Sequence, residues 1–481
     1  MSEAYPRLVS LYIDGQWTAA AGGETLPIHN PATGEEIGQV AHARRADLDR
    51  ALAAAERGLA QWRQVSTVVR ARILRKASAI LRERIPAVAR LMTQEQGKPL
   101  GEALGELERT CDTNDWLAGE GERIYGRLIP ARAPNVTQMV LHDPIGVVVG
   151  FTPWNFPTFQ MVRKTGGALA AGCSIIVKGP EEAPASCAEL IRAYHEAGVP
   201  PGVVNLVYGT PAEISSYLVP QPLVRKVSFT GSTVVGKQLA ALAGQHMKVT
   251  TFELGGHAPV LVFADANLEA AAAMLCGMKY RNAGQSCINP TRYLVQRSVY
   301  AKFVELFTAR ARGVKVGNGL DGGVQMGPMA NPRRVAAVQA FVEDAVQQGA
   351  RLTLGGKRIG ARGNFFEPTV LGDVPLSARA MNEEPFGPVA LFRPFDTLDE
   401  AITEANRLPY GLAAYAFTTS PATARAVVSR VESGMISINH LGLGMHETPF
   451  GGVKDSGYGF EGGSEAIEAY IQTRFATLAD L

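Results

Sequence analysis

The sequence contains no apolar run of the roughly 18 residues that a membrane-spanning helix requires. Its first residues, from Met1 to Arg7, also lack the basic and then apolar pattern of a secretion signal. Only five cysteines occur in 481 residues, and they are odd in number without paired spacing, which is typical of a reducing compartment. We therefore expect a cytoplasmic protein with no membrane partner.

Clusters of one charge and clusters of histidine are missing as well. The 47 Lys and Arg nearly balance the 45 Asp and Glu, and no basic patch with interleaved aromatic residues occurs, so no nucleic-acid partner is expected. The eight histidines are scattered without ligand spacing beside a carboxylate, so no metal site is predicted. No Gly-x-Gly-x-x-Gly run follows an apolar strand in residues 146–252, so a standard Rossmann phosphate loop is not expected.

What is present is a long alternation of apolar segments, in a chain long enough for two or three domains. Residues 11–40 have the pattern of short hairpins, 45–122 that of helices, and 123–142 that of extended chain. From Gly146, apolar strands alternate with helices, which predicts a doubly wound parallel sheet. The predicted strands are 147–151, 174–177, 203–207 and 226–229, and the predicted helices include 185–197 and 234–242. A second α/β series runs from Ala258 to about residue 440, and the tail 464–481 combines a short helix with extended chain.

One cysteine stands apart from the regular elements. The Ala-rich segment 268–279 predicts a helix that ends at Asn282, and Gly284 permits a turn that most residues resist. Cys287 follows among small and polar neighbours, where partial exposure and nearby donors would favour the nucleophilic thiolate. The alternative is a structural cysteine in a buried loop. The other four cysteines, in or beside regular elements, are expected to be core or surface fillers.

Two motifs at strand ends carry candidate catalytic groups. In Phe151–Pro157, two prolines bracket a Trp-Asn pair, and Asn155 could donate to a developing oxyanion; a structural Pro-aromatic turn is the alternative. In Thr251–Gly256, Glu253 stands between apolar residues that would raise its pKa toward that of a general base; the alternative is a surface glutamate.

Two further strand ends could hold a nucleotide. Lys178 and Glu181 could reach ribose hydroxyls, with a solvated loop as the alternative. The segment 229–236 joins a strand to a helix through small residues, and Ser232 or Thr233 can cap that helix. By itself, this segment is more typical of a plain tight turn.

In their order along the chain, these motifs resemble those of the aldehyde dehydrogenase superfamily, and the resemblance covers nearly the whole sequence. The matching segments are 153–157, 252–256, 284–287, 384–388 and 449–452. The resemblance implies an α/β fold with a doubly wound Rossmann-like cofactor domain, an α/β catalytic domain and a small β oligomerisation extension. It divides the chain into a cofactor domain of residues 1–122 and 143–252, a catalytic domain of residues 253–440, and an extension of residues 123–142 and 464–481.

The resemblance also implies residue roles. Cys287 would be the nucleophile, Asn155 would hold the oxyanion with the backbone N–H of the cysteine, and Glu253 would activate the water that releases the acid. Glu181 would repel a 2′-phosphate, so NAD is the expected cofactor and NADP the alternative. The segment 178–181 departs from the family's Lys-Pro-(Ser/Ala)-Glu at two positions. The implied cofactor residues are Thr152, Pro153, Trp154, Lys178, Glu181, Gly209, Phe229, Gly231, Ser232, Leu254, Glu384 and Phe386.

The implied substrate is an aldehyde, and two arginines match the succinate-semialdehyde branch of the family. Arg163 and Arg281 would bind a substrate carboxylate, so succinate semialdehyde is the first candidate; surface or ion-paired arginines are the alternative. A serine of that branch is replaced near Gly444 and Met445, which leaves room for a longer or aromatic aldehyde. Rival functions are a CoA-acylating relative and a non-catalytic homologue. Relatives imply a homodimer or homotetramer.

Overall fold

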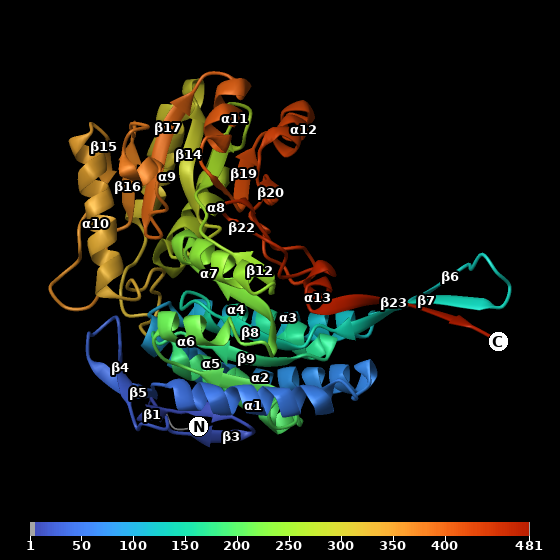
Figure 1. Cartoon of the computed structure of the whole chain (residues 1–481). Coiled ribbons are helices and arrows are strands. Elements are labelled where there is room, and N and C mark those ends of the chain that lie inside the picture. The colour runs from blue at the N-terminus through green and yellow to red at the C-terminus, as the bar shows by residue number, and fades with distance from the viewer. Residues whose placement is uncertain (1–4, 481) are drawn as a thin grey trace.

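The computed structural model describes residues 5–480. Figure 1 shows two bodies, each built around a sheet, and a narrow arm that projects to one side. Within the described residues, no helix combines the length and apolar character needed to cross a bilayer.

The first body contains an eight-stranded sheet in the order β22-β12-β11-β8-β9-β10-β2-β3. The five strands from β12 to β10 are parallel, and the strands at both edges pair antiparallel. Its strands are β2 (Leu11–Ile13), β3 (Gln16–Thr18), β8 (Val147–Phe151), β9 (Ser174–Lys178), β10 (Val204–Val207), β11 (Val224–Thr230), β12 (Val249–Glu253) and β22 (Gly457–Tyr458). The four strands predicted from apolar runs are therefore confirmed.

Helices cover both faces of this sheet (Figure 1). They are α1 (Arg45–Trp62), α2 (Thr67–Gln96), α3 (Leu100–Gly121), α4 (Pro157–Ala171), α5 (Pro184–Ala197), α6 (Pro211–Leu218) and α7 (Thr233–Gln245). Proline opens α4 and α5, where no N–H partner is needed, and left-handed Gly172 and Gly198 close them. The short helix α6 was not predicted.

The order of the strands marks a topological switch point. The chain runs from β8 outward through β9 to β10, then returns to the other side of β8 with β11 and β12. In such sheets, ligands bind at the carboxyl ends of the strands beside the reversal. Here those ends lead into the segments that begin at Thr152 and Gly231, two of the residues predicted to hold a cofactor.

The second body contains a seven-stranded sheet in the order β15-β16-β17-β14-β13-β19-β20, parallel except for β15. Its strands are β13 (Ala258–Val262), β14 (Pro290–Gln296), β15 (Arg351–Leu354), β16 (Thr369–Gly372), β17 (Val389–Phe395), β19 (Ala413–Phe417) and β20 (Met435–Ile438). Its helices are α8 (Leu268–Tyr280), α9 (Arg297–Arg312), α10 (Pro332–Gln347), α11 (Leu398–Asn406) and α12 (Pro421–Arg430).

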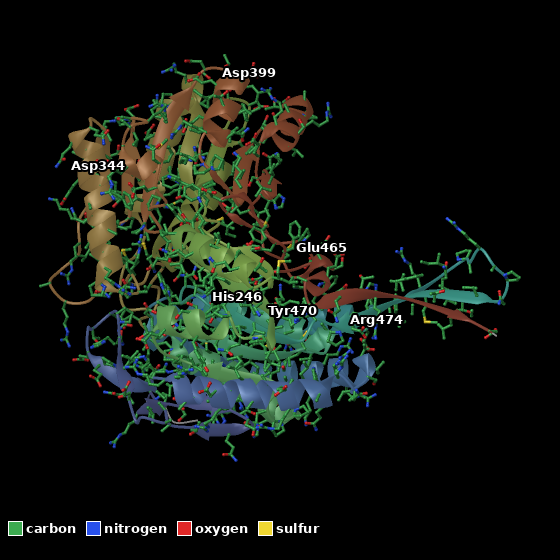
Figure 2. All side chains as sticks on the ribbon, in the orientation of Figure 1. His246, Asp344, Asp399, Glu465, Tyr470 and Arg474 are labelled. Carbon is green, nitrogen blue, oxygen red and sulfur yellow. The ribbon has the colours of Figure 1, made fainter. Side chains whose placement is uncertain are left out.

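The arm is a three-stranded antiparallel sheet of β6 (Arg127–Ile129), β7 (Val136–Pro144) and β23 (Ile471–Ala479). Figure 2 shows Tyr470 where β23 leaves the body and Arg474 farther out. Small elements complete the fold: β1 (Leu8–Val9), β4 (Thr25–His29), β5 (Glu36–Ala41), β18 (Tyr410–Gly411), β21 (Val453–Lys454), α13 (Glu465–Glu468), and the 3₁₀ turns η1 (Arg281–Gly284) and η2 (Arg379–Met381).

Each body has its own apolar core. The first core runs from Val9 to Leu254 and takes in three residues of the tail, Ala466, Ile467 and Tyr470. The main core of the second body runs from Ala258 to Phe417. Glu253 itself ends β12 in the first sheet. The predicted domain division stays a prediction.

Candidate active site

A left-handed turn presents Cys287. Helix α8 ends at Tyr280, and Asn282, Ala283 and Gly284 then all have positive φ, between 50° and 74°. Two of the three are not glycine, so this turn is strained and must be held by its surroundings. Two side-chain hydrogen bonds of Asn282 hold the turn in place. Its side chain accepts from Gln96 at 2.9 Å and donates to the backbone carbonyl of Asn155 at 2.8 Å.

Two glycines allow other segments to approach this loop closely. A Cβ on Gly284 would lie 2.1 Å from the carbonyl oxygen of Gly387, and one on Gly256 would lie 2.3 Å from the carbonyl oxygen of Cys287. Both positions therefore exclude any larger residue. The cysteine loop is thereby packed against two of the motifs that the sequence singled out, 252–256 and 384–388.

The Cys287 thiol lies in an environment that disfavours its ionisation. Burial raises its pKa to about 12, and the carboxylates of Glu384 and Glu253 act in the same direction, whereas Arg163 lowers it. Cys287 is half-buried, so the partial exposure expected of it is present. The thiolate is nevertheless disfavoured, because desolvation of the sulfur and two nearby carboxylates raise the pKa of the thiol.

Asn155 follows β8 and is buried beside the cysteine loop. Its Nδ2 donates to the carbonyl oxygen of Gln285 at 3.2 Å, two residues before Cys287, and its Oδ1 has no partner among the described residues. Its backbone carbonyl accepts from Lys98 Nζ at 2.7 Å as well as from Asn282. The amide is thus held at the same loop that presents the thiol.

Glu253 ends β12, and both of its carboxylate oxygens are buried without a hydrogen-bond partner among residues 5–480. Burial raises the pKa of this carboxyl well above its usual range, Glu461 adds to the rise, and Arg163 and Lys164 oppose it. The sequence-based expectation of a raised pKa is confirmed in direction. A buried carboxyl without partners is costly, so this position is typical of a functional group.

The predicted cofactor residues gather in two places at the carboxyl edge of the first sheet. At the end of β9, Glu181 pairs with Lys178 and also accepts from the backbone N–H of Gly209 at 3.2 Å. At the end of β11, Ser232 caps the thirteen-residue helix α7, beside Gly231, and the N-terminus of such a helix favours anionic groups.

The remaining predicted cofactor residues join these places to the second body. Glu384 accepts from the backbone N–H of Gly256 at 3.1 Å, and burial raises its pKa to about 7. The rings of Trp154 and Phe386 meet edge to face with centroids 5.6 Å apart. The others line the ends of β8, β11 and β12: Thr152, Pro153, Phe229 and Leu254. Basic, acidic and helix-terminal groups at the switch point fit a dinucleotide with a pyrophosphate and two riboses.

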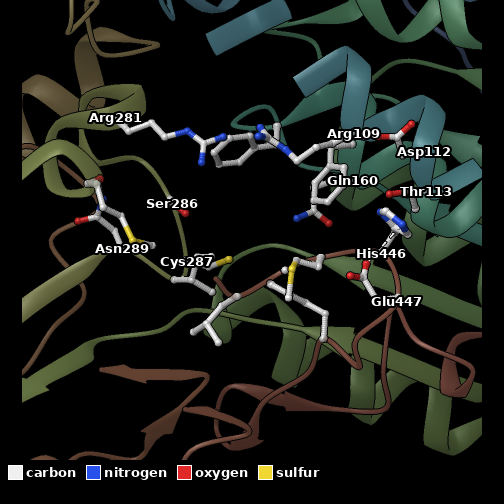
Figure 3. A pocket seen from close by; sticks show the side chains of 18 residues that line it. Arg109, Asp112, Thr113, Gln160, Arg281, Ser286, Cys287, Asn289, His446 and Glu447 are labelled. Carbon is white, nitrogen blue, oxygen red and sulfur yellow. Dashed lines mark hydrogen bonds and ion pairs between the residues drawn. The ribbon is translucent and has the colours of Figure 1, made fainter. Parts of the chain in front are cut away.

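A cavity of about 330 Å³ opens above Cys287. Its walls are mainly apolar, and charged residues surround its outer part: the apolar side chains are Phe156, Phe159, Met278, Ile288, Leu443, Met445 and Phe450, and the charged ones are Arg109, Asp112, Arg281 and Glu447. In Figure 3 the sulfur of Cys287 and the amide of Gln160 both face this space. The cavity has the form of a substrate channel that ends at a thiol.

Two arginines reach toward each other across this cavity (Figure 3). Arg281 makes only a long ion pair with Glu102, at 3.9 Å, and its guanidinium lies 5.4 Å from the Phe156 ring. Arg109 on α3 lies 5.9 Å from the Phe159 ring, and desolvation together with the positive charge of Arg281 lowers its pKa. Two cations that repel each other across a cavity form a site for an anion.

Arg163 occupies a different place from the other predicted substrate arginine. It is 2% exposed, and its guanidinium lies between the rings of Phe159 and Phe450, at 4.4 and 4.1 Å. It is not one of the residues that line the cavity, whereas Arg281 is. The structure therefore brings Arg281 to the cavity and places Arg163 behind its aromatic wall.

Sequence reasoning missed Arg109 and Lys98. Arg109 faces the cavity from the interior of a helix whose sequence has no motif, and only the folded arrangement pairs it with Arg281. Lys98 forms a fully buried ion pair with Glu106 and holds the carbonyl of Asn155. A lysine between Gly97 and Pro99 after a long helix gives no local signal of that role. No group of three or more His, Cys, Asp or Glu in residues 5–480 is arranged to hold a metal ion.

The chain is similar to curated enzymes over almost its entire length. It is 46% identical to a 4-(hydroxymethyl)benzenesulfonate dehydrogenase of Comamonas testosteroni, with 99% of each chain covered. It is 42% identical to a glutarate-semialdehyde dehydrogenase of Pseudomonas putida, with 97% of each covered. It is 41% identical to the NADP⁺ succinate-semialdehyde dehydrogenase of Escherichia coli, with 96% of each covered.

Solved structures agree with the fold. A succinate-semialdehyde dehydrogenase of Burkholderia pseudomallei matches with a TM-score of 0.96 at 40% identity, covering 98% of each chain. An NAD-dependent aldehyde dehydrogenase of Sinorhizobium meliloti matches with a TM-score of 0.97 at 33% identity, covering 99% of this chain and 96% of that one. The model described as "Aldehyde dehydrogenase family" matches residues 17–476. With sequence, fold and motif order in agreement over this length, the chain belongs to the aldehyde dehydrogenase family.

Proposed function

We propose that this enzyme oxidises an aldehyde that carries a carboxylate or sulfonate group to the corresponding acid, with NAD(P)⁺ as the cofactor. The observation that carries the proposal is the pair of guanidinium groups, Arg109 and Arg281, above Cys287. Arg281 has only its 3.9 Å ion pair with Glu102, and Arg109 makes no ion pair among the described residues, so both can bind a substrate anion. The relatives named above act on a benzenesulfonate and on semialdehydes of dicarboxylic acids, which supports an anionic substrate.

In the proposed reaction, one role belongs to each of three residues: Cys287, Asn155 and Glu253. Cys287, once deprotonated, adds to the aldehyde carbon, and Nδ2 of Asn155 donates to the oxyanion that forms. Loss of hydrogen with its electron pair from that carbon leaves a thioester on Cys287. Glu253 as a carboxylate then takes a proton from water, the water oxygen bonds to the acyl carbon, and the C–S bond breaks to release the acid.

The cofactor would lie at the switch point of the first sheet. Lys178 and Glu181 would hold its adenosine ribose, the N-terminus of α7 at Ser232 its pyrophosphate, and Glu384 its nicotinamide ribose. When bound, NAD(P)⁺ supplies the acceptor for the hydrogen and electron pair that leave the substrate carbon. Because a carboxylate at Glu181 beside the adenosine ribose would repel a 2′-phosphate, NAD is the favoured form.

The walls of the cavity support an aromatic anionic aldehyde as a second candidate beside succinate semialdehyde. Phe156, Phe159 and Phe450 line the same cavity as Cys287 and the arginine pair. A substrate ring between these side chains would gain edge-to-face and stacking contacts that a four-carbon chain lacks. A para-substituted benzaldehyde would also place its anion far from the aldehyde carbon, toward the outer part of the cavity.

The test compares matched aldehydes. We expect kcat/KM with NAD⁺ to be higher for succinate semialdehyde than for butanal, and higher for 4-formylbenzenesulfonate than for benzaldehyde. A hydrogen bond to a charged group contributes about 1.5–3 kcal/mol. Arg281→Met and Arg109→Met should therefore each lower kcat/KM for the charged aldehydes about 10- to 100-fold and leave the uncharged ones nearly unchanged.

Arg90→Met, at an exposed position of α2 outside the cavity, is the matched control and should change neither aldehyde class. Repeating the panel with NADP⁺ tests the cofactor preference. Equal losses for charged and uncharged aldehydes in the Arg281 and Arg109 variants would sink the anionic-substrate proposal. Activity that survives Cys287→Ala would sink the assignment of the nucleophile.

A further inference from the structure

Two polar side chains in the wall of the cavity are buried without a hydrogen-bond partner. Thr113 on α3 is 2% exposed and Gln160 on α4 is 3% exposed, and both line the cavity above Cys287. Thr113 Oγ1 and Gln160 Oε1 have no partner among residues 5–480. Buried polar atoms are nearly always hydrogen-bonded in folded proteins, so these two atoms require an explanation.

Thr113 and Gln160 belong to the same part of the wall, because α3 and α4 pack against each other. The hydroxyls of Thr110 and Thr158 lie 3.1 Å apart and join the two helices. Thr113 follows this contact by three residues and Gln160 by two, so each lies within one helical turn of it. Figure 3 shows both side chains on the same side of the cavity as Arg109.

The packing of the wall does not require polar groups at these two positions. Valine has nearly the shape of threonine, and methionine nearly that of glutamine. Apolar residues of equal shape would fill the same space and would leave no hydrogen-bonding atom unpaired, whereas an unpaired buried acceptor or donor destabilises the fold. Thr113 and Gln160 are therefore explained by a hydrogen-bonding partner that enters the cavity.

The two atoms fit a neutral group that both donates and accepts hydrogen bonds. The amide oxygen of Gln160 only accepts, whereas the hydroxyl of Thr113 donates or accepts. An anion only accepts, so it cannot pair with the amide oxygen. An ammonium group would donate to it, but Arg109 and Arg281 line the same cavity and would repel that charge. A hydroxyl group meets both requirements, because it can donate to Gln160 and accept from Thr113.

We propose that Thr113 and Gln160 are specificity-determining residues that bind a hydroxyl group of the substrate. Arg109 and Thr113 are four residues apart on α3, so their side chains share one face of the helix with Cβ atoms about 5–6 Å apart. The substrate class is then an aldehyde with an anion and, on a carbon between the aldehyde and the anion, a hydroxyl group. The inference rests on the proposed function, the oxidation of an anionic aldehyde in this cavity.

The experiment compares aldehydes that differ by one hydroxyl group. Initial rates with NAD⁺ give kcat/KM, per free aldehyde, for succinate semialdehyde and for its two hydroxylated forms, 2-hydroxy-4-oxobutanoate and 3-hydroxy-4-oxobutanoate. Butanal with 2-hydroxybutanal and 3-hydroxybutanal is the uncharged series. A substrate without the hydroxyl leaves buried polar atoms unpaired, so at least one hydroxylated acid should exceed succinate semialdehyde in kcat/KM by about 10- to 100-fold.

Gln160→Met and Thr113→Val keep the shape of each side chain and remove its hydrogen bond. Each should abolish most of the preference for the hydroxylated acid, leave kcat/KM for succinate semialdehyde unchanged or higher, and retain the wild-type melting temperature. Gln347→Met, at the exposed end of α10, is the matched control and should keep the preference. If Gln160→Met does not fold, Thr113→Val carries the comparison.

The inference is overturned if neither hydroxylated acid exceeds succinate semialdehyde in the wild type, or if both variants keep the preference. An equal loss of kcat/KM for all aldehydes in both variants would also overturn it, because the two residues would then serve only the structure of the wall. If the charged aldehydes react no faster than butanal, the proposed function fails instead, while the uncharged series still tests the hydroxyl site. The two failures are thus distinguishable.

Discussion

Cys287 and Glu253 both lie where ionisation is disfavoured, although both are proposed to react as anions. Desolvation raises the pKa of each group, and negative charge on Glu384 or Glu253 raises the pKa of the thiol further. The arrangement keeps a reactive thiol protected until a step requires its anion. Ionisation is therefore a control point of the reaction, since each anion forms only at a cost that the site must offset.

The raised pKa of Glu253 has a consequence for the second half of the reaction. Hydrolysis of the thioester requires the carboxylate, so its rate should rise as pH rises through the raised pKa of Glu253. Glu253→Gln should keep a burst of NAD(P)H equal to the enzyme concentration, lower the steady-state rate at least about 100-fold, in the range of general-base effects, and abolish that pH dependence. Rapid-quench kinetics at several pH values measures both phases.

Glu447→Gln is a suitable control, because Glu447 lines the outer cavity and has no proposed part in hydrolysis. It should keep both the burst and the pH dependence of the wild type. Loss of the burst in Glu253→Gln would contradict the role of Glu253 in the second half-reaction alone, since acylation would then depend on it too.

Some residues of the site could be predicted from the sequence, and others could not. Asn155, Glu253 and Cys287 stand in short motifs with prolines, glycines or apolar flanks, so their type and setting could be predicted. The rise in the pKa of Cys287 could not, because it depends on how deeply Glu253 and Glu384 are buried beside it. The cavity position of Arg109 depends on the packing of α3 against a loop some 170 residues later, which no local pattern encodes.

At the scale of an element, the turn between α8 and β14 positions the thiol. Gly284 has a φ of 74°, and a Cβ there would lie 2.1 Å from a backbone oxygen that cannot move aside easily. Gly284→Ala should therefore displace the Cys287 loop, lower kcat by more than about tenfold, and lower the free energy of unfolding by about 1–3 kcal/mol through backbone strain. Initial rates and urea unfolding of the same preparation measure the two effects.

The matched control lies seven residues earlier. Gly277 is exposed on α8, and nothing lies within 4 Å of a Cβ added there. Gly277→Ala should leave kcat unchanged and stabilise the helix by up to about 1 kcal/mol. If Gly284→Ala were as harmless as Gly277→Ala, the turn would not position the nucleophile as described.

Elements with strong end signals were predictable, and those without them were not. The helices α4 and α5 combine a proline start, a glycine end and a clear apolar period, and the strands before them are unbroken apolar runs. Helix α6 spans only eight residues, so it offers barely two turns of periodicity between two loops. The antiparallel edges of the first sheet join segments about 200 residues apart, Leu206 with Tyr12 and Glu253 with Gly457, and local sequence cannot specify such pairings.

At the scale of the whole molecule, the arm is the part least covered by the rest of the chain. Strands β7 and β23 pair over nine residues, from Ile471 with Pro144 to Ala479 with Val136. Several of its apolar side chains stay exposed: Leu128 is 75% exposed, Phe475 56% and Leu478 53%. Large exposed apolar residues on a projecting sheet are typical of an interface, and the predicted homo-oligomer would cover them.

We expect Phe475→Glu combined with Leu478→Glu to shift the protein toward the monomer, because the charges would be buried without partners in an interface. Light scattering coupled to size-exclusion chromatography measures the mass. Val428→Glu, at a residue 57% exposed on α12, is the control and should leave the mass unchanged. An unaltered mass in the double variant would show that subunits associate through another surface.

The two proposed reactive groups belong to different scaffolds. Glu253 terminates a strand of the first sheet, while Cys287 stands between α8 and β14 of the second body, and the edge-to-face contact of Trp154 with Phe386 bridges the two near them. The reaction therefore depends on the contact between the two bodies, because neither body contains both reactive groups. A substitution that moves the two bodies apart by an ångström would leave a folded protein that binds the cofactor. That protein would form the thioester on Cys287 but would not hydrolyse it.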